Sequence, residues 1–491
     1  MRASNWWRDN MAKKTTSSAL AYVRTEPAPL LPPPASQTGI LGWLHKNILA
    51  SMTDFSSPVA ALKSLLMAFF TVLIGYVGIT QIMSLIDFAF ISAVWTDPDG
   101  LKREACWTVD QGGSLPSGWH GACWPFVKAK FKFLMYGPYD INQLWRVNVT
   151  GLIGLIALAW LLIEPLPFRR YVGIFLLTVY PVMSIILLYG KLDPSSITLT
   201  VITLGGILTP SPASLTGIII VGLGLMSLAR LGAMGRLNRA IEDRARQIEL
   251  SGWVVVAFAL VFALFVEGYD LERIDTNDWG GLMITLVVAI TGIVASLPLG
   301  ILLALGRRSN MPATRIICTV FIEFWRGVPL ITVLFMASVM LPLFLPEGVN
   351  FDNLLRALVG VMLFSAAYMA EVVRGGLQAI DKGQFEGSSA VGLTYWQSMR
   401  LVILPQALTH VIPGIVNTFI GLFKDTTLVS IIGLFDLLGA GQSALADAAW
   451  ASPVQSHSMY LFIAAIFFVF CFGMSRYSIY MENKLSRSRK H

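Results

Sequence analysis

Long apolar runs recur along the chain and limit what it can fold into more strictly than any other feature. A transmembrane α-helix needs about 20 consecutive, mostly apolar residues, and most of these runs reach that length. Only 13% of the 491 residues are charged, about half the fraction in soluble globular proteins. We therefore predict an all-α polytopic membrane protein and exclude a soluble enzyme, a nucleic-acid-binding protein and a disordered scaffold. The runs occupy residues 61–95, 147–164, 171–190, 197–209, 213–230, 252–267, 281–305, 316–345, 355–373, 411–435 and 459–480.

The number of spans depends on the run at 197–209, which is short and leads into Pro210. We treat it as a half-helix and expect about ten transmembrane helices. Short basic loops mark the cytoplasmic side of such a protein, and their alternation here places both termini in the cytoplasm. Eight spans remain an alternative if parts of 197–267 do not cross. The basic loops contain Arg169 and Arg170, Arg230 to Arg246, Arg307, Arg308 and Arg315, and Lys484 to Lys490.

The formal net charge of +7 follows from these loops, so it indicates membrane orientation and not an anionic partner. Residues 230–250 are basic and amphipathic, and we expect them to form a helix on the inner leaflet. The complementary loop 96–146 is long and should face the periplasm. It contains Cys106 and Cys123, which form a disulfide if that compartment is oxidising. Two free thiols are the alternative.

No pattern in the sequence carries bond-making chemistry. There is no phosphate-binding G-x-x-x-x-G-K-[ST] loop, no His or Cys spacing typical of a metal site, and no nucleophile elbow. We therefore predict no catalytic residue, no metal site and no cofactor. A membrane-embedded enzyme is disfavoured for this reason.

A polar segment between the runs at 355–373 and 411–435 carries the strongest functional pattern. Residues Glu386 to Val391 can form one short helix that Gly392 ends. A second helix should run from Thr394 towards Leu404 and stop at Pro405. Two short helices at a bend make a rigid projection from the membrane, which suits docking into a partner protein.

This segment resembles the EAA loop of ABC-importer permeases, written E-A-A-x3-G-x9-I-x-L-P. Two departures replace the paired alanines, and Val402 takes the place of isoleucine. More motifs within 279–440 resemble histidine/glutamine-type polar amino-acid permeases; they lie at 279–282, 324–330, 367–376 and 421–428. Residues 121–126 in the outer loop narrow the resemblance to permeases of general L-amino-acid ABC importers. The positions that correspond to ATPase coupling are Glu386, Gly387, Ser388, Gly392, Leu404 and Pro405.

The resemblance implies a five-helix type I importer core at 279–480. Composition and hydropathy place a polar tail at 1–60 and a transmembrane extension at 61–278 before this core, and a basic tail at 481–491 after it. It implies a bacterial inner-membrane subunit that moves L-amino acids from periplasm to cytoplasm. Its partners would be an ATP-binding subunit dimer, a second homologous permease and a periplasmic amino-acid-binding protein. The alternative is an ion-coupled secondary transporter that works without an ATPase and binds its coupling ion at carboxylates such as Glu371.

Charged residues within the core spans are candidates for the substrate pathway. Charges inside a membrane are costly and usually functional, and a zwitterionic amino acid needs groups of both signs. Structural pairing among these residues and Arg374, or snorkelling of long side chains to the interface, is the alternative. The candidates are Glu371, Arg326, Glu323, Lys424 and Asp425.

Overall fold

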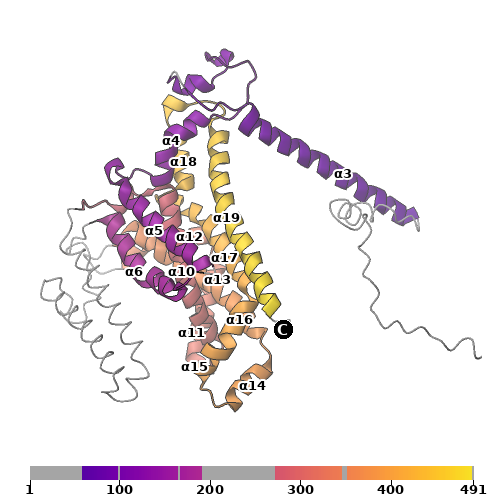
Figure 1. The fold of residues 1–491 in the computed structure, drawn as a ribbon, viewed down its shortest axis with the longest axis vertical. Helices are drawn as coiled ribbons and strands as arrows, with labels where there is room; N and C mark the ends of the chain where they lie inside the picture. Colours follow the sequence, from indigo (N-terminus) through magenta and orange to yellow (C-terminus); the bar gives the residue numbers. More distant parts are fainter. Residues whose placement is uncertain (1–57, 98–99, 164–165, 191–270, 345–350, 489–491) are drawn as a thin grey trace, which may run out of the picture. The chain divides into compact units, whose positions relative to one another are not determined.

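The computed structural model describes residues 58–97, 100–163, 166–190, 271–344 and 351–488, and this part of the chain is almost entirely helical (Figure 1). The predicted runs at 197–209, 213–230 and 252–267, and the amphipathic helix at 230–250, lie outside the described residues. The α-helices are α3 (Pro58–Ile86), α4 (Trp124–Tyr136), α5 (Leu144–Leu162), α6 (Arg169–Tyr189), α10 (Gly281–Arg307), α11 (Pro312–Gly327), α12 (Leu330–Phe335), α13 (Asn353–Gln378), α14 (Lys382–Ala390), α15 (Tyr395–Ser398), α16 (Leu404–His410), α17 (Ile412–Asp425), α18 (Leu437–Leu445) and α19 (Gln455–Ser488).

Shorter elements connect these helices. The π-helical turns are Asp87–Ile91, Met336–Met340 and Met399–Ile403. The 3-10 turns are Lys102–Cys106, Val109–Gln111, Ile141–Gln143, Thr276–Asp278, Leu341–Phe344, Thr426–Ile432 and Ala448–Trp450. The two-residue strand β1 (Phe435–Asp436) forms parallel bridges with Gly280 and Gly281 at the start of α10.

The predicted membrane-spanning, all-helical fold is confirmed. Within the described residues, 7 helices are long and apolar enough to cross a membrane, and a bent pair raises this to 8 if it counts as one span. They match the predicted runs outside 191–270. The 7 spans are Leu65–Ile91, Ile141–Leu162, Arg169–Tyr189, Gly281–Arg307, Asn353–Gln378, Ile412–Ile432 and Gln455–Leu485.

The run at 316–345 is not the single straight span that its apolar length suggests. It divides into Pro312–Gly327 and Leu330–Phe344, which are bent by 105°. The break lies at Val328 and Pro329, both in extended conformation. A residue before proline is pushed out of the helical region by contact with the proline ring, so Val328 cannot continue α11 into α12.

The chain divides into two compact units, residues 1–91 and 92–491. In the first unit, the span at Leu65–Ile91 has no residue buried in its most apolar window. Large apolar side chains are exposed all around it, including Leu65, Phe69, Ile74 and Ile82. A helix that is apolar on every side is typical of a membrane-embedded segment.

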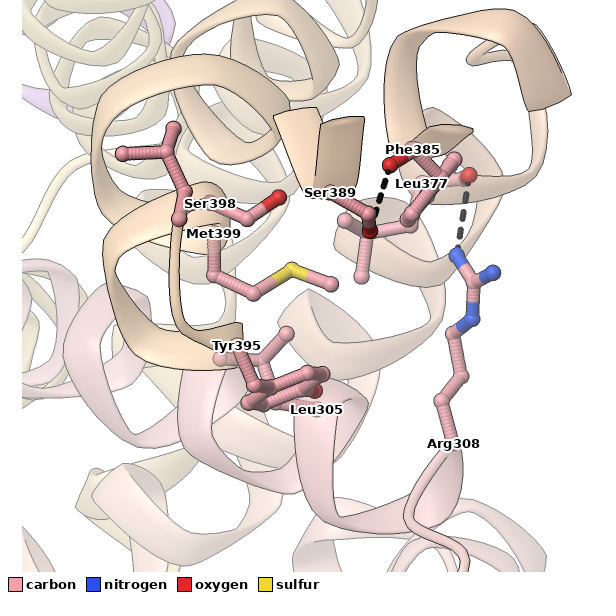
Figure 2. A pocket seen from close by; sticks show the side chains of 9 residues that line it. Leu305, Arg308, Leu377, Phe385, Ser389, Tyr395, Ser398 and Met399 are labelled. Atoms are coloured by element: carbon pink, nitrogen blue, oxygen red, sulfur yellow. Dashed lines mark hydrogen bonds between the residues drawn. The ribbon is translucent and has the colours of Figure 1, made fainter. Parts of the chain in front are cut away.

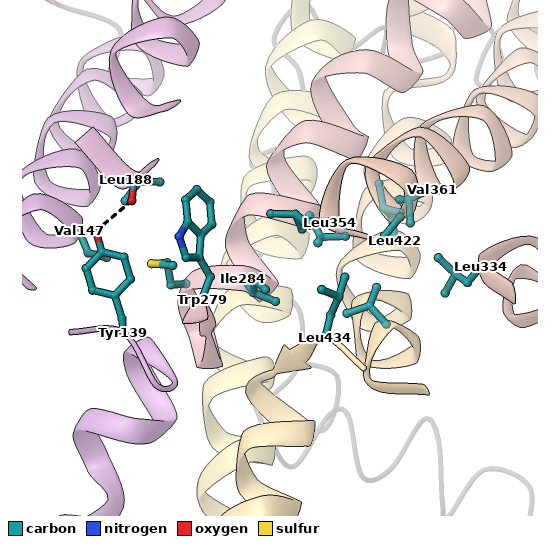
Figure 3. Packing of buried hydrophobic residues seen from close by; sticks show 14 of the residues in the cluster. Tyr139, Val147, Leu188, Trp279, Ile284, Leu334, Leu354, Val361, Leu422 and Leu434 are labelled. Carbon is teal, nitrogen blue, oxygen red and sulfur yellow. Dashed lines mark hydrogen bonds between the residues drawn. The ribbon is translucent and has the colours of Figure 1, made fainter. Parts of the chain in front are cut away.

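In the second unit, α10 and α13 pack along much of their length and form the centre of the core. Helices α5 and α6 of the extension pair with each other. Their residues Val147 and Leu188 join a buried apolar cluster that includes Trp279, Ile284 and Leu354 (Figure 3). Helices α5 and α6 and the transport core therefore share one hydrophobic interior.

The predicted loop at 96–146 is more ordered than its polarity suggests, since it contains α4 and the start of α5. Helix α4 packs on α10, α18 and α19. The contact with α10 is close because Gly137 and Gly280 lie against each other without side chains between them.

The two ends of the second unit differ in character (Figure 1). One end carries α4, α18 and the start of α19, while α14 and α15 lie at the other end together with the last turns of α10 and α13. The first part of the basic tail predicted at 481–491 is helical, because α19 continues to Ser488. A helix already spanning the membrane extends readily, since each added residue needs only one further hydrogen bond.

Candidate functional site

The predicted projection between the last two core spans is present as α14, α15 and α16. Helix α14 ends at Ala390, and Gly392 adopts a left-handed conformation with φ +83°. The Gly392 N–H donates to Ser389 O over 2.9 Å, and the Leu393 N–H donates to Ser388 O over 3.2 Å. These bonds satisfy the last carbonyls of α14, and glycine is the residue that takes this conformation without strain. The predicted bend at Gly392 is therefore a helix-terminating turn.

The predicted helix stop at Pro405 is wrong. The π-helical turn Met399–Ile403 leads directly into α16, and Pro405 lies in the first turn of that helix. The Leu404 N–H bonds to Met399 O, five residues back. Because of this wider turn, no helical hydrogen bond is needed from the backbone nitrogen at position 405. Proline, which has no N–H, is therefore tolerated there. The second arm of the projection therefore continues as one bent helix to His410.

The projection presents a mixed apolar and polar surface. Val391 is 79% exposed and Trp396 is 66% exposed. Glu386, Gly387, Gly392 and Pro405 are exposed too, while Leu404 is half-buried. Exposed large apolar side chains gathered at one place are typical of a surface that binds another protein.

One predicted coupling residue, Ser388, points inward. It is buried, and its Oγ lies 2.6 Å from the Oγ of buried Ser398, which joins α14 to α15. The small side chain allows this approach and also bonds to Phe385 O over 2.8 Å. The role that the geometry gives Ser388 is to hold the two arms together.

A cavity of about 300 Å³ lies between the projection and the membrane-spanning core (Figure 2). Arg308, which follows α10, crosses this boundary. Its Nη1 donates to Leu377 O over 2.9 Å, and its guanidinium lies 5.5 Å from the centre of the Phe385 ring. One side chain thus connects the ends of α10 and α13 with α14. The cavity is lined by Leu305, Arg308, Leu377, Phe385, Ser389, Leu393, Tyr395, Ser398 and Met399.

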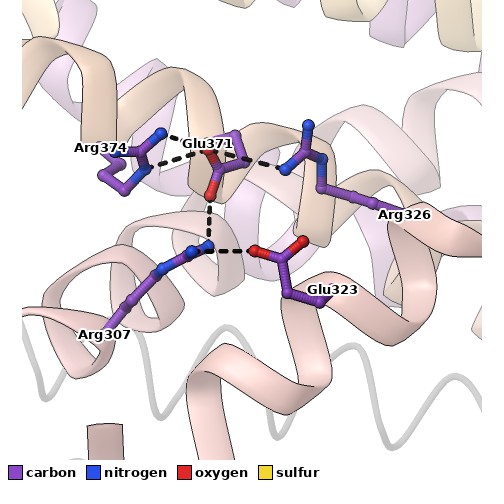
Figure 4. A network of polar contacts seen from close by, with 5 residues as sticks. All are labelled: Arg307, Glu323, Arg326, Glu371 and Arg374. Carbon is purple, nitrogen blue, oxygen red and sulfur yellow. Dashed lines mark hydrogen bonds and ion pairs between the residues drawn. The ribbon is translucent and has the colours of Figure 1, made fainter. Parts of the chain in front are cut away.

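Beside this connection, five charged side chains form one network (Figure 4). Glu371 Oε1 accepts from Arg307 Nη1 over 2.6 Å, and Glu371 Oε2 accepts from Arg374 Nη2 over 2.7 Å. Arg326 Nη1 lies 3.6 Å from Glu371 Oε2. Arg307 also pairs with Glu323 over 2.8 Å. Helices α10, α11 and α13 therefore meet at a cluster in which three arginines outnumber two carboxylates.

Burial differs across the network and suggests different roles. The Glu371 side chain is only 16% exposed, whereas that of Glu323 is 54% exposed. Arg326 lies just before the break between α11 and α12, and its guanidinium is 5.8 Å from the Tyr368 ring centre. Glu371 is thus the central acceptor, and Arg326 is the arginine that it holds least tightly.

Lys424 and Asp425 do not join this network within the described residues. They end α17, where the neighbouring Leu422 packs against Gly292 in α10. The α10 segment from Gly292 to Arg307 is roughly 22 Å long at 1.5 Å per residue. The predicted pathway residues therefore form two groups at different depths, one near the projection and one closer to the centre of the core.

Comparison with known proteins identifies the family. Residues 296–487 match the model of the family described as binding-protein-dependent transport system inner membrane component. The inner membrane amino-acid ABC transporter permease protein YhdY of Escherichia coli strain K12 is 40% identical over 93% of this chain and 97% of its own length. The chain belongs to the amino-acid ABC transporter permeases.

Two further similarities cover this permease in whole or in part. The glutamate/glutamine/aspartate/asparagine transport system permease protein BztC of Rhodobacter capsulatus is 38% identical over 96% of this chain and 100% of its own length. The match to YhdY and BztC includes the N-terminal extension. A crystal structure of an amino acid ABC transporter with histidines is 30% identical over 42% of this chain and 92% of that chain, with a TM-score of 0.37.

Membership settles what the subunit does not do. An ABC permease forms the membrane passage, and a partner ATP-binding subunit hydrolyses ATP, so this subunit is not an enzyme by itself. Permeases of this family lie in the inner membrane of bacteria and work with a substrate-binding protein.

Sequence reasoning missed the functional contacts of Arg307 and Arg308, which it assigned only to membrane orientation. Both are cations in a short loop, the ordinary topological pattern. The available signal was the number of charges near this loop, because Glu371 and Glu323 need cationic partners inside or beside the membrane. The sequence does not say which arginine meets which carboxylate.

At the opposite end of the permease, Cys106 and Cys123 are joined by a disulfide with a Cα–Cα distance of 5.9 Å. Both side chains are buried, at 2% and 1% exposed. The Cys123 N–H donates to Ser458 Oγ over 2.8 Å, which fixes the loop to the start of α19. The disulfide thus closes the segment that leads into α4.

Proposed function

We propose that this permease moves L-amino acids from the periplasm to the cytoplasm and is driven by ATP hydrolysis in a dimer of ATP-binding subunits. The observation that carries the proposal is the direct link from the exposed projection to the charged network. Arg308 contacts Phe385 of α14, and its neighbour Arg307 pairs with Glu371 and Glu323. A displacement of α14 therefore acts on the end of α10 and on the charged groups beside it.

The coupling residues divide by burial into contact and support. Glu386, Gly387 and Pro405 are exposed and face the ATPase in this proposal. Gly392 sets the angle between the two arms through its left-handed backbone. Ser388 supports that angle from inside through Ser398. A rigid bent projection transmits a push better than a flexible loop, because packed elements shift as units.

We place the inner part of the substrate pathway at the Glu371 network. The excess positive charge, and the position of Arg326 beside a broken helix, are features of transport cavities. In this arrangement Glu371 does not bind the cargo amino group directly, since its oxygens already face three arginines. It holds cationic wall residues in place. Lys424 and Asp425 supply charges of both signs deeper in the core.

The proposed complex contains a second homologous permease and a periplasmic amino-acid-binding protein. The chemistry of the two ends of the second unit supports a periplasmic side at one end and a cytoplasmic side at the other. The end with the disulfide suits an oxidising compartment. The end with Arg307, Arg308 and Arg315 suits the cytoplasm by the positive-inside rule, and the same alternation places both termini there.

The competing function is ion-coupled secondary transport by the lone chain. It needs a carboxylate that is free to bind a cation, and the three arginines around Glu371 disfavour that role. Reconstitution into proteoliposomes separates the two functions. The purified complex with its ATPase and binding protein should take up amino acids only when ATP is present on the side of the membrane that carries the ATP-binding subunits. Uptake by the lone chain on an ion gradient, without ATP, would contradict the proposal.

A further inference from the structure

Helix α4 lies at the outer end of the core and has two different faces. On its inner side, Phe126 and Leu134 are buried against α18 and α19 residues of one apolar cluster. Cys123, before the helix, bonds to Ser458 at the start of α19, and Gly137, after it, lies against Gly280 at the start of α10. The helix therefore runs across the outer ends of two transmembrane spans, at the depth of the bilayer interface.

The outward side of α4 holds a groove with a volume of about 440 Å³. Trp95 stacks on Trp124, with ring centres 5.7 Å apart and planes at 23°. The Trp124 N–H donates to Val94 O over 3.0 Å, which holds Trp95 beside the helix. Trp124, Val127, Lys128, Phe131 and Lys132 of α4 are spaced three or four residues, or about two turns, apart, so they share one face of the helix. The groove is lined by Trp95, Trp124, Val127, Lys128, Phe131 and Lys132.

Two ammonium groups rim this aromatic wall. Lys128 and Lys132 are both exposed and lie one helical turn apart, where like charges repel each other. In the part of the chain that the structure describes, neither has an ion-pair or hydrogen-bond partner. Lys130, on another side of the same helix, pairs with Asp447 over 2.5 Å. The groove thus combines an apolar wall with two cations, which together favour a ligand that is apolar in one part and anionic in another.

We propose that this groove binds one anionic phospholipid of the outer leaflet of the inner membrane. The phosphate lies between Lys128 and Lys132, and the upper part of an acyl chain lies on Trp95, Trp124 and Phe131. Tryptophan is favoured at the membrane interface, and basic pockets beside transmembrane helices bind anionic headgroups. A soluble anion would use the lysines but would gain nothing from the aromatic wall.

The test is native mass spectrometry of the full chain, purified in detergent, with added phosphatidylglycerol or phosphatidylcholine. Wild-type protein should retain phosphatidylglycerol at least ten-fold more tightly than phosphatidylcholine. The double variant Lys128→Gln/Lys132→Gln should lose most of that preference, with an affinity for phosphatidylglycerol about ten-fold lower. Lys130→Gln removes the same charge from the same helix outside the groove and should change the affinity less than two-fold.

Two further arms identify the ligand. Trp95→Ala should weaken both lipids, since it removes apolar wall and no charge. Millimolar inorganic phosphate should not displace bound phosphatidylglycerol. An unchanged preference in the double variant, or in both single lysine variants if the double variant does not fold, would overturn the proposal. Displacement by phosphate would overturn it too, because it would show a simple anion site.

Discussion

Arg307 Nη1 donates a hydrogen bond to Glu371 Oε1 over 2.6 Å and so joins the C-terminal parts of α10 and α13. The next residue, Arg308, bonds to Leu377 O and lies over Phe385 of the projection. Consecutive arginines therefore contact the proposed pathway and the proposed ATPase-docking segment. A shift of a fraction of a helical turn at α14 would change both sets of contacts.

Glu371→Gln tests the network. The change keeps the size of the side chain and leaves three arginines without their central carboxylate. The loss in stability should stay below the roughly 3–5 kcal/mol that breaking a fully buried ion pair costs, because the arginine side chains are partly exposed. We expect reduced ATP-coupled uptake in proteoliposomes, most of all for cationic amino acids, because the released positive charge repels them. Glu323→Gln is the matched control, since Glu323 is more exposed and, among the described residues, pairs with Arg307 but with neither Arg326 nor Arg374. Unchanged uptake of neutral, acidic and basic amino acids by a well-folded Glu371→Gln protein would refute the pathway role.

Gly392→Val tests the geometry of the projection. A Cβ at Gly392 has nothing within 4 Å, so the substitution does not crowd the bend. The strain comes from φ +83°, which a β-branched residue adopts at a cost of about 1–3 kcal/mol. The angle between α14 and α15 should change, and ATP hydrolysis should continue with little uptake.

Gly433→Val is the matched control for this prediction. Gly433 has φ +86° and nothing within 4 Å of a Cβ. It lies two residues before β1, which pairs with the start of α10, away from the projection. It should lower stability to a similar extent while uptake per ATP stays near the wild-type value. If the two variants took up the same amount of amino acid per ATP hydrolysed, Gly392 would have no special role in coupling.

The Cys106–Cys123 disulfide should stabilise the segment that leads into α4. Closing a loop of 17 residues limits the unfolded chain by about 3 kcal/mol in the chain-entropy model. Cys106→Ser/Cys123→Ser should lower the thermal midpoint, whereas Cys318→Ser, at a free cysteine, should not. Peptide mass mapping of non-reduced protein from the membrane should find the linked pair. Two free thiols in that map would show that the bond does not form.

Asp436, directly before α18, predicts that the stability of the fold depends on pH. It is fully buried, and burial raises the pKa of Asp436 from 3.8 to about 6, although Leu438 and Gly439 N–H groups bond to its carboxylate. Between these pH values the folded protein binds more protons than the unfolded chain. Stability should therefore rise as pH falls from 7 towards 4, by an upper limit of roughly 3 kcal/mol at 1.36 kcal/mol per pKa unit.

Asp436→Asn isolates this effect because an amide does not titrate in this range. Its one oxygen still accepts one of the two N–H bonds that cap α18, which Asp436 Oδ1 and Oδ2 accept from Gly439 and Leu438. The gain in melting temperature that the wild type shows at lower pH should be absent in the variant. Parallel melting curves of the two proteins from pH 7.5 to pH 5 would show that Asp436 is not the group responsible.

The sequence predicted those parts of the fold that local chemistry decides. An apolar run of about 20 residues has one stable form in a bilayer, so the described spans fall where expected. Gly392 was predictable because a left-handed helix end favours glycine. Pro405 was not, since a π-helical turn allows a proline that a regular helix would reject. The 105° bend at Val328 and Pro329 lies within an unbroken apolar run, so composition alone does not reveal that the helix changes direction there.

The candidate site was predictable in its residue types and not in its pairing. Charged residues in the core spans drew attention to Glu371, Arg326 and Glu323 because of their cost in lipid. Their arrangement depends on how α10, α11 and α13 cross, which brings in Arg307 from a neighbouring helix end. The same charge argument grouped Lys424 and Asp425 with them, although the structure places that pair elsewhere along α10.

Site-specific photo-cross-linking in the assembled transporter tests most directly whether the projection receives the force of the ATPase. A photoreactive residue replaces Val391, which is 79% exposed on the projection, or Leu343, which is 78% exposed in the 3-10 turn Leu341–Phe344, outside the projection. We expect a cross-link from position 391 to the ATP-binding subunit, with a yield that changes between nucleotide-free and ATP-bound states, and none from position 343. A transporter active in ATP-driven uptake that gives no ATPase cross-link at position 391 would contradict it.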